Sequence, residues 1–388
     1  MKSIISLRGF LSAQKRREFL EKDLNIKLEN VGKFTFTEKE VKDKNIENLI
    51  GSTQIPLGIA GPLKILKHPK ILTTYIPLAT TEGALVASIS RGCKAITEAG
   101  GAKVLVEDVG QTRGPVFKTL GIEHGRKVQK WAENHYDLIA KITHQTSSFL
   151  KLNKIQYSIV GKSLFIRFNY LTTDAMGMNM VTIATEKAVK LIEQKTGAIC
   201  ISLAGNFDID KKPAWLNFIL GRGKKVWAEI ILSEKIIKDV LKTTPEKITE
   251  VVYHKNQLGS IMSGSLGFNA HFANIIAALF IATGQDPAHV VEGSLGVTTA
   301  EVLDNGDLYF SIYLPALVVG TVGGGTHLPT QQEALKIMKV NSVLEYAQIV
   351  GAAVLAGELS LLASLSEGSL AKAHKQLGRR ENLKGAKP

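Results

Sequence analysis

The stretch between residues 114 and 204 constrains the fold more than any other part of the chain. The strand-like run GPVFKTLG precedes a helical pattern from about Glu123 to His144, and two alternating runs, IQYSIV and SLFIRFNY, then flank a Gly161-Lys162 turn. A second helical pattern, from about Met176 to Lys195, leads to the strand-like run AICISLA. The order is βαββαβ, which predicts a ferredoxin-like domain.

The flanking sequence predicts a larger domain that surrounds this unit. Gly51 opens the run GSTQIPLGIAGPL, whose mixture of Gly, Pro and apolar residues favours strands and tight turns. The apolar segments Phe272 to Thr283 and Ile349 to Leu365 are too short or too charged to span a membrane, so we expect buried helices. We place the stretch from Leu266 to Thr283 at the centre of the large domain.

These patterns together predict an α+β protein with three parts. Residues 1–50 form a small helical N-terminal domain. Residues 51–113 and 205–388 form a large domain around a central buried helix. Residues 114–204 form the inserted ferredoxin-like domain.

Charge and cysteine content narrow the class of protein. The formal net charge of +13 favours anionic partners. A nucleic-acid-binding protein is nevertheless the weaker alternative, because the sequence lacks both an RNP-like aromatic motif and a concentrated basic helix. The only cysteines, Cys93 and Cys200, leave no room for a disulfide framework or a CxxC metal site, and they fit a reducing cytoplasm.

Familiar cofactor motifs are absent, but two glycine-rich segments remain. The sequence has no GxGxxG, GxxxxGK[ST] or HExxH, so a Rossmann fingerprint, a P-loop and a zincin helix are unsupported. DAMGMNM (Asp174 to Met180) runs into a helix, and GTVGGGT (Gly320 to Thr326) is a possible nest of backbone amides. Both can favour a phosphate group, although plain turn chemistry also explains the second segment.

Several polar residues are candidates for chemistry, and each also has an ordinary structural role. Glu82 precedes a helix, where a carboxylate is favourable. Asp286 precedes Pro287, as a capping or turn residue does. Lys211 and Lys212 fit a solvated loop, and His374 fits an exposed basic segment. From the residues alone, these candidates do not specify a reaction.

Six ordered sequence blocks together resemble one family, the HMG-CoA reductases, over nearly the whole chain. ENLIGSTQIPLGIAGPL begins the resemblance, and the six blocks are TTEGALVASISRGCKAI, DAMGMNM, DKKPAWLN, GFNAHFANIIAALFIATGQD, GTVGGGTHLPTQQ and AGELSLLASLSEGSLAKAH. The DAMGMNM form resembles the class that includes the eukaryotic enzymes, without their membrane-spanning region. The resemblance implies a soluble enzyme that reduces (S)-HMG-CoA to (R)-mevalonate and CoA with two equivalents of NADPH.

The resemblance also implies which residues act. The four catalytic residues of the family match Glu82, Lys211, Asp286 and His374. Lys211 would stabilise the oxyanion formed when hydride reaches the thioester carbonyl. His374 would protonate the departing CoA thiolate, because histidine titrates near neutral pH. A protonated Glu82 would then supply a proton to mevaldehyde, and Asp286 would couple Lys211 with Glu82.

Further positions match binding residues of the family. The implied substrate contacts are Arg113, Asp210, Lys212, Ser88, Arg91 and Asn274. The implied cofactor contacts are Ser147, Ser148, Asp174, Met176, Gly177, Met178, Asn179, Gly323 and Gly324. No metal is implied. The expected assembly is a homodimer or a dimer of dimers with the active site at the subunit interface, without nucleic acid or membrane as partners.

Three positions depart from the family pattern. Ser148 stands where an arginine usually contacts the adenosine 2'-phosphate, so discrimination for NADPH is weakened unless Lys151 substitutes, and NADH is a possible cofactor. Ala204 replaces a serine near the HMG group, and Arg380 replaces a regulatory serine. The alternative within the enzymes is therefore an NAD-linked reductase that acts in mevalonate degradation.

Overall fold

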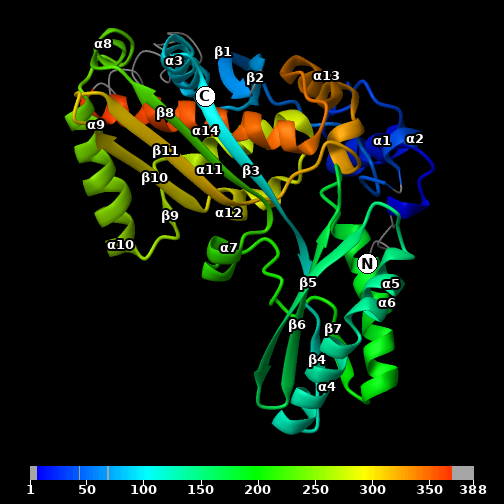
Figure 1. Cartoon of the computed structure of the whole chain (residues 1–388). Helices are drawn as coiled ribbons and strands as arrows, with labels where there is room; N and C mark the ends of the chain where they lie inside the picture. Colours follow the sequence, from blue (N-terminus) through cyan, green and yellow to red (C-terminus); the bar gives the residue numbers. More distant parts are fainter. Residues whose placement is uncertain (1–6, 43, 68–69, 369–388) are drawn as a thin grey trace.

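Figure 1 shows the computed structural model, which describes residues 7–42, 44–67 and 70–368. A broad unit of sheet and helices lies above a narrower unit formed by the middle of the sequence. The long strand β3 (Ala102–Arg113) runs from the first unit into the second, and its last three residues pair with β6 of the narrower unit.

The N-terminal segment is helical only in part. Its helices are η1 (Leu7–Gly9), α1 (Ala13–Leu24) and α2 (Glu38–Val41). Ser12 caps α1 by accepting a hydrogen bond from the Lys15 amide, and Thr37 and Glu40 form a capping box around α2. The chain between α1 and α2 is irregular, and a small apolar cluster around Val41 and Leu49 holds the segment together.

A mixed sheet forms the frame of the large unit. Its strand order is β2-β1-β3-β8-β11-β10-β9, with parallel pairing only between β1 and β3 and between β9 and β10. Besides β3, the strands are β1 (Leu57–Lys67), β2 (Lys70–Ala79), β8 (Gly223–Leu232), β9 (Gly267–Phe268), β10 (Gly296–Val302) and β11 (Leu308–Leu317).

Helices pack against this sheet, among them α14 against β3, β8 and β11 and α3 against β1. The α-helices are α3 (Leu85–Glu98), α7 (Trp215–Leu220), α8 (Glu234–Ile236), α9 (Pro245–Val251), α10 (Ser260–Ser263), α11 (Phe272–Thr283), α12 (Val290–Gly293), α13 (Pro329–Met338) and α14 (Val343–Ser366). Short helices of other types are η2 (Ile237–Leu241), η3 (Val252–Gly259), η4 (Pro287–His289) and η5 (Gly324–His327). Ser233 caps α8 and Thr244 caps α9, with Pro245 at its first turn.

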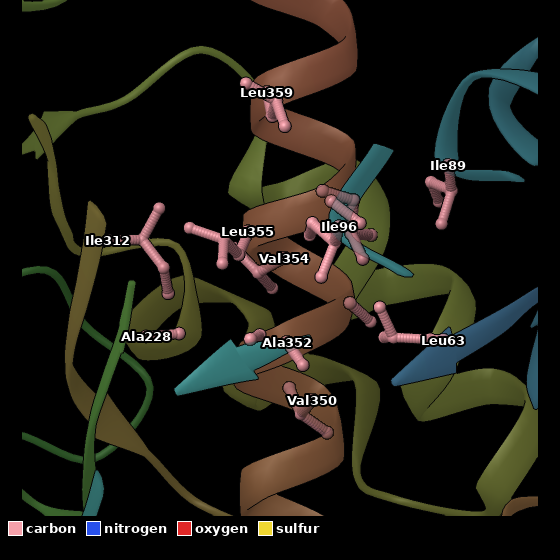
Figure 2. Packing of buried hydrophobic residues seen from close by; sticks show 14 of the residues in the cluster. Leu63, Ile89, Ile96, Ala228, Ile312, Val350, Ala352, Val354, Leu355 and Leu359 are labelled. Atoms are coloured by element: carbon pink, nitrogen blue, oxygen red, sulfur yellow. The ribbon is translucent and has the colours of Figure 1, made fainter. Parts of the chain in front are cut away.

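The central helix of the large unit is α14, not the segment from Leu266 to Thr283. Figure 2 shows Val354, Leu355 and Leu359 of α14 among apolar residues of the sheet and of α3. Helix α14 is long and apolar enough to span a membrane, but 78% of its apolar 18-residue window is buried inside the protein, as expected of a core helix.

The segment from Phe272 to Thr283 forms the predicted buried helix, but the stretch from Leu266 to His271 before it does not belong to that helix. Helix α11 begins only at Phe272, because the side chain of Asn269 accepts a hydrogen bond from the Phe272 amide. The buried carboxylate of Glu358 on α14 accepts the amides of Ala270 and His271, so the chain before α11 is held in a bend.

The narrower unit confirms the predicted βαββαβ order. Its elements are β4 (Val116–Lys118), α4 (Ile122–Asn134), α5 (Tyr136–His144), β5 (Lys151–Val160), β6 (Ser163–Leu171), α6 (Met178–Thr196) and β7 (Ile199–Ser202). The antiparallel sheet has the order β7-β4-β6-β5, the ferredoxin-like arrangement. A hydrophobic core built from residues 117–198 belongs to this unit and supports its description as an insertion.

One predicted helix is divided in two. The pattern from Glu123 to His144 forms α4 and α5, which meet at His135. The backbone of His135 leaves helical geometry, with φ −117° and ψ 27°, and its ring Nδ1 lies 2.7 Å from the carbonyl oxygen of Trp131. The apolar spacing continues across this break, which is why the sequence alone does not reveal it.

Candidate active site

A pocket of about 850 Å³ lies where the two units meet. DAMGMNM and GTVGGGT both line it, and a β-bridge between Ala175 and Val322 joins these two glycine-rich segments. The loop before α7 contributes Asp210 and Lys211, and the segment after α11 contributes Asp286. Four segments far apart in sequence therefore form one cavity.

Lys211 and Asp286 form an ion pair in this pocket. Lys211 Nζ lies 2.7 Å from Asp286 Oδ2, and the two side chains are 41% and 33% exposed. Asp286 Oδ1 also accepts a hydrogen bond from the Ala288 amide, so its predicted capping role and its contact with the lysine coexist. Although partial burial opposes it, the hydrogen bond from Lys211 contributes to holding the pKa of Asp286 below its usual value.

The loop that carries Lys211 adopts an unusual backbone conformation. Asn206, Ile209 and Lys211 all have left-handed φ angles, of 63°, 55° and 57°. Arg113 binds this loop through Asp208, with Arg113 Nη1 3.1 Å from Asp208 Oδ2. Nε and Nη2 of Arg113 both donate to Thr182 Oγ1 on α6. Such a conformation persists only where surrounding contacts hold it, and Arg113, which makes these contacts, lines the pocket.

Glu82 lies in a different place from Lys211 and Asp286. Its two carboxylate oxygens accept hydrogen bonds from Asn274 Nδ2 at 3.1 and 2.9 Å, and its amide donates to Thr80 Oγ1. Asn274 is in the first turn of α11, whereas Asp286 follows the last turn of that helix. A helix of 12 residues is about 18 Å long, so the Glu82–Asn274 pair and the Lys211–Asp286 pair lie at opposite ends of α11.

Ser88 and Arg91 face the central helix. Ser88 Oγ lies 3.0 Å from Ser360 Oγ on α14, and Arg91 donates to the hydroxyl and carbonyl oxygens of the same serine. Burial lowers the pKa of the Arg91 guanidinium. Among the described residues, neither Ser88 nor Arg91 lines the pocket that one chain forms.

The predicted cofactor residues divide into two groups. Met176, Gly177, Met178, Asn179, Gly323 and Gly324 line the pocket. Gly177 is the N-cap of α6, with φ 86°, and a Cβ there would approach the Thr172 side chain to 2.5 Å, so this position favours glycine. Ser147 and Ser148 lie instead in the turn between α5 and β5, with Ser148 exposed.

Two further predicted residues have structural contacts of their own, and one cannot be placed. Asp174 Oδ1 accepts the amide of Val343 at the start of α14, and it thereby anchors DAMGMNM to the central helix. Lys212 is exposed, with Nζ 3.2 Å from the carbonyl oxygen of Asp210. His374 lies outside the described residues.

Three buried residues behind the Lys211–Asp286 pair were not predicted. Arg222 lies before β8, and His289 and Glu292 lie just after Asp286. All three are fully buried. In the sequence, His289 and Glu292 follow Asp286 at helical spacing. This spacing is equally typical of a solvated helix face, so it does not by itself predict a buried ionic group.

Comparisons with known proteins agree on one family. The model of the family described as hydroxymethylglutaryl-coenzyme A reductase matches residues 12–379. The 3-hydroxy-3-methylglutaryl-coenzyme A reductase of Methanocaldococcus jannaschii is 51% identical over 378 residues, covering 95% of this chain and 93% of the relative. That of Pyrococcus horikoshii is 50% identical over 379 residues, covering 95% of this chain and 92% of the relative.

A eukaryotic relative and a solved structure extend the comparison. Reductase 2 of Dictyostelium discoideum is 45% identical over 342 residues, covering 84% of this chain and 64% of that protein. The class II reductase of Streptococcus pneumoniae, solved with NADPH in open conformations, has a TM-score of 0.69 at 20% identity, covering 93% of this chain and 100% of that one. This structural likeness concerns the fold.

Proposed function

The chain belongs to the hydroxymethylglutaryl-coenzyme A reductase family and reduces HMG-CoA to mevalonate in the isoprenoid pathway, and on that premise we propose which residues carry the reaction. The observation on which this proposal depends most is the Lys211–Asp286 ion pair in a pocket lined by both glycine-rich segments.

Lys211 is the proposed electrophilic residue. Reduction of a thioester carbonyl, and later of mevaldehyde, places negative charge on the carbonyl oxygen. The ammonium group of Lys211 is fixed by Asp286 at 2.7 Å, so it needs little reorganisation to meet that charge. Aspartate is ionised at neutral pH, so the Asp286 carboxylate can hold the lysine there.

Glu82 is the proposed proton donor, and His374 the proposed acid for the CoA thiolate. Asn274 donates to both carboxylate oxygens of Glu82. The proposed proton donor is therefore fixed at the opposite end of α11 from Lys211. One chain therefore carries two incomplete sites. We propose that Glu82 of the partner subunit completes the site around Lys211 and Asp286 in a two-fold homodimer, in which each surface meets its counterpart.

The pocket fits a phosphate-bearing nicotinamide cofactor. When bound, that cofactor supplies the hydride for both reductions. The amides at the N-terminus of α6, a helix of 19 residues, favour anions. Gly323 and Gly324 have positive φ angles, and a Cβ at either would meet open space, so their backbone is free to approach a ligand.

We propose NADPH as this cofactor, with the cytoplasm as the place of the reaction. Ser148 is exposed beside the start of β5, where Lys151 offers a cation for the 2'-phosphate. Both cysteines are free, as expected in a reducing compartment.

The direct test is a reductase assay that follows nicotinamide absorbance with HMG-CoA and either NADPH or NADH. We expect oxidation of the nicotinamide, formation of mevalonate and free CoA thiol, and a higher kcat/KM with NADPH. A higher kcat/KM with NADH would reject the cofactor proposal and favour the NAD-linked alternative. Full turnover by the Lys211→Ala variant would reject the role of the lysine.

A further inference from the structure

Behind the Lys211–Asp286 pair lies a buried layer of three ionisable side chains, those of Arg222, His289 and Glu292. Arg222, His289 and Glu292 have 0% of their surface exposed. Burying such groups is unfavourable unless they are paired and hydrogen-bonded, so their contacts indicate what the layer does. We infer that Glu292 is a positioning residue for the reduction, which holds the backbone of Lys211, and this inference rests on the role proposed for that lysine.

The carboxylate of Glu292 binds the lysine's backbone directly. Glu292 Oε1 accepts a hydrogen bond from the Lys211 amide at 2.6 Å. Lys211 has a φ of 57°, a conformation that a residue with a long side chain rarely adopts. This bond holds the strained backbone of Lys211 in place, and from that backbone the side chain reaches Asp286 Oδ2 at 2.7 Å.

Arg222 fixes Glu292 and the residue before the lysine. Its Nη1 lies 2.7 Å from the same Glu292 oxygen, and its Nη2 lies 2.9 Å from Asp210 Oδ1. Its Nε donates to Thr112 Oγ1 on β3 at 2.9 Å. The guanidinium group therefore connects α12, the lysine loop and the sheet, so that the loop cannot move without breaking a buried charged contact.

His289 lies between Glu292 and Asp286. Its Nδ1 is 3.4 Å from Glu292 Oε2, and its Nε2 is 3.9 Å from Asp286 Oδ2 and 4.0 Å from Asp210 Oδ1. Neither ring nitrogen nor Glu292 Oε2 has a hydrogen-bond partner among the described residues. The buried ring therefore lies between the carboxylates of Glu292, Asp286 and Asp210 and fills the space behind the ion pair.

A metal ion is the competing explanation of this geometry. Ligand atoms of Asp210, His289 and Glu292 all lie within 4.8 Å of one another, a spacing that a cation could use. Arg222 already pairs with both of those carboxylates, and the ammonium group of Lys211 is the partner of the adjacent Asp286. A third cation would have to displace the guanidinium group, so the arrangement favours a protein cation over a metal ion.

The test compares Glu292→Gln in two backgrounds. Glutamine keeps the size of the side chain, but its neutral oxygen accepts the Lys211 amide and the Arg222 guanidinium more weakly than the carboxylate does. In the natural background we expect kcat to fall about 10- to 100-fold, as small misplacements of a catalytic group do. KM for HMG-CoA should stay within about 3-fold, because the lost interaction belongs to the transition state.

The second background is Lys211→Ala, measured at high enzyme concentration. If Glu292 acts through the lysine, Glu292→Gln should cause no further loss there, since coupled residues are not additive. A loss of the same factor in both backgrounds would overturn the inference. If Lys211→Ala alone keeps the natural kcat, the role proposed for the lysine fails, and the two failures are thereby distinguished.

Three additional measurements guard the result. Glu301→Gln on β10 makes the same charge change at an exposed site and should leave kcat unchanged. If thermal unfolding shows that Glu292→Gln does not fold, His289→Gln replaces it, with a smaller loss expected that also disappears beside Lys211→Ala. Dialysis against a chelator should leave kcat unchanged, whereas a loss that Zn²⁺ restores would establish a metal site instead.

Discussion

Asn274 donates its side-chain amide to both carboxylate oxygens of Glu82, at 3.1 and 2.9 Å. The pair lies at the start of α11, and the ion pair of Lys211 with Asp286 lies beyond its end. In a dimer, the start of α11 in one subunit could lie against the end of α11 in the partner subunit. The Glu82–Asn274 pair of one subunit would then meet the Lys211–Asp286 pair of the other, and inactive variants can test this arrangement.

Subunit mixing should restore activity. Glu82→Gln and Lys211→Ala homodimers are each expected to be nearly inactive. After unfolding and refolding together, each heterodimer has one site with both substitutions and one site with neither, so random pairing should restore about a quarter of the natural activity. Each variant refolded alone is the control. Heterodimers that form without any recovery would contradict a shared site.

Removal of the Lys211 ammonium group should slow the chemical step. We expect Lys211→Ala to lower kcat about 100- to 1000-fold, the usual effect of deleting one group that stabilises an oxyanion. Lys187→Ala, at an exposed position on α6, provides a matched charge change and should keep the natural kcat. Steady-state kinetics with HMG-CoA would measure both.

The ion pair of Asp286 should make stability depend on pH. Its pKa is lowered in the folded protein, so its contribution is present above the unfolded value, about 4, and is lost as pH falls through the folded value. Asp286→Asn keeps the capping oxygen but cannot ionise. We therefore expect the natural protein to be more stable than the variant at pH 7.

Urea unfolding at several pH values would measure the difference, which should shrink as the pH falls below about 4. Asp304→Asn in the exposed turn between β10 and β11 controls for the change in net charge. A difference between the natural protein and Asp286→Asn that is the same at every pH would show that ionisation of Asp286 contributes nothing to folding.

The cofactor preference should respond to Ser148. Because a charged hydrogen bond contributes about 1.5–3 kcal/mol, Ser148→Arg is expected to raise the ratio of kcat/KM for NADPH to that for NADH by about 10-fold or more. Ser148→Gln adds length without charge and should leave the ratio near its natural value. An unchanged ratio in the arginine variant would place the 2'-phosphate elsewhere.

The close contact of α3 with α14 should tolerate only glycine at position 92. A Cβ on Gly92 would lie 1.9 Å from the carbonyl oxygen of Ala356, so Gly92→Ala must push the helices apart. We expect destabilisation of about 3 kcal/mol or more, measured by urea unfolding. At Gly121, no heavy atom lies within 4 Å of an added Cβ, so Gly121→Ala should have little effect.

Local sequence patterns predicted much of the inserted unit. The turn at Gly161-Lys162 depends on neighbouring residues, and the structure confirms it between β5 and β6. The division at His135 was missed, and so was the bend that keeps residues 266–271 out of α11. In the second case the cause is Glu358, which lies almost 90 positions later in the chain.

The sequence by itself determined the βαββαβ unit, the buried character of the apolar helices and, through family resemblance, the identities of the catalytic candidates. Only the tertiary structure decided that Lys211 meets Asp286, that Glu82 lies at the far end of α11, and that Glu292 holds the lysine. The physical reason is the distance along the chain over which each kind of interaction acts. Propensities and caps act between neighbouring residues, whereas the contact of a buried carboxylate with a distant backbone amide exists only after the whole core has packed.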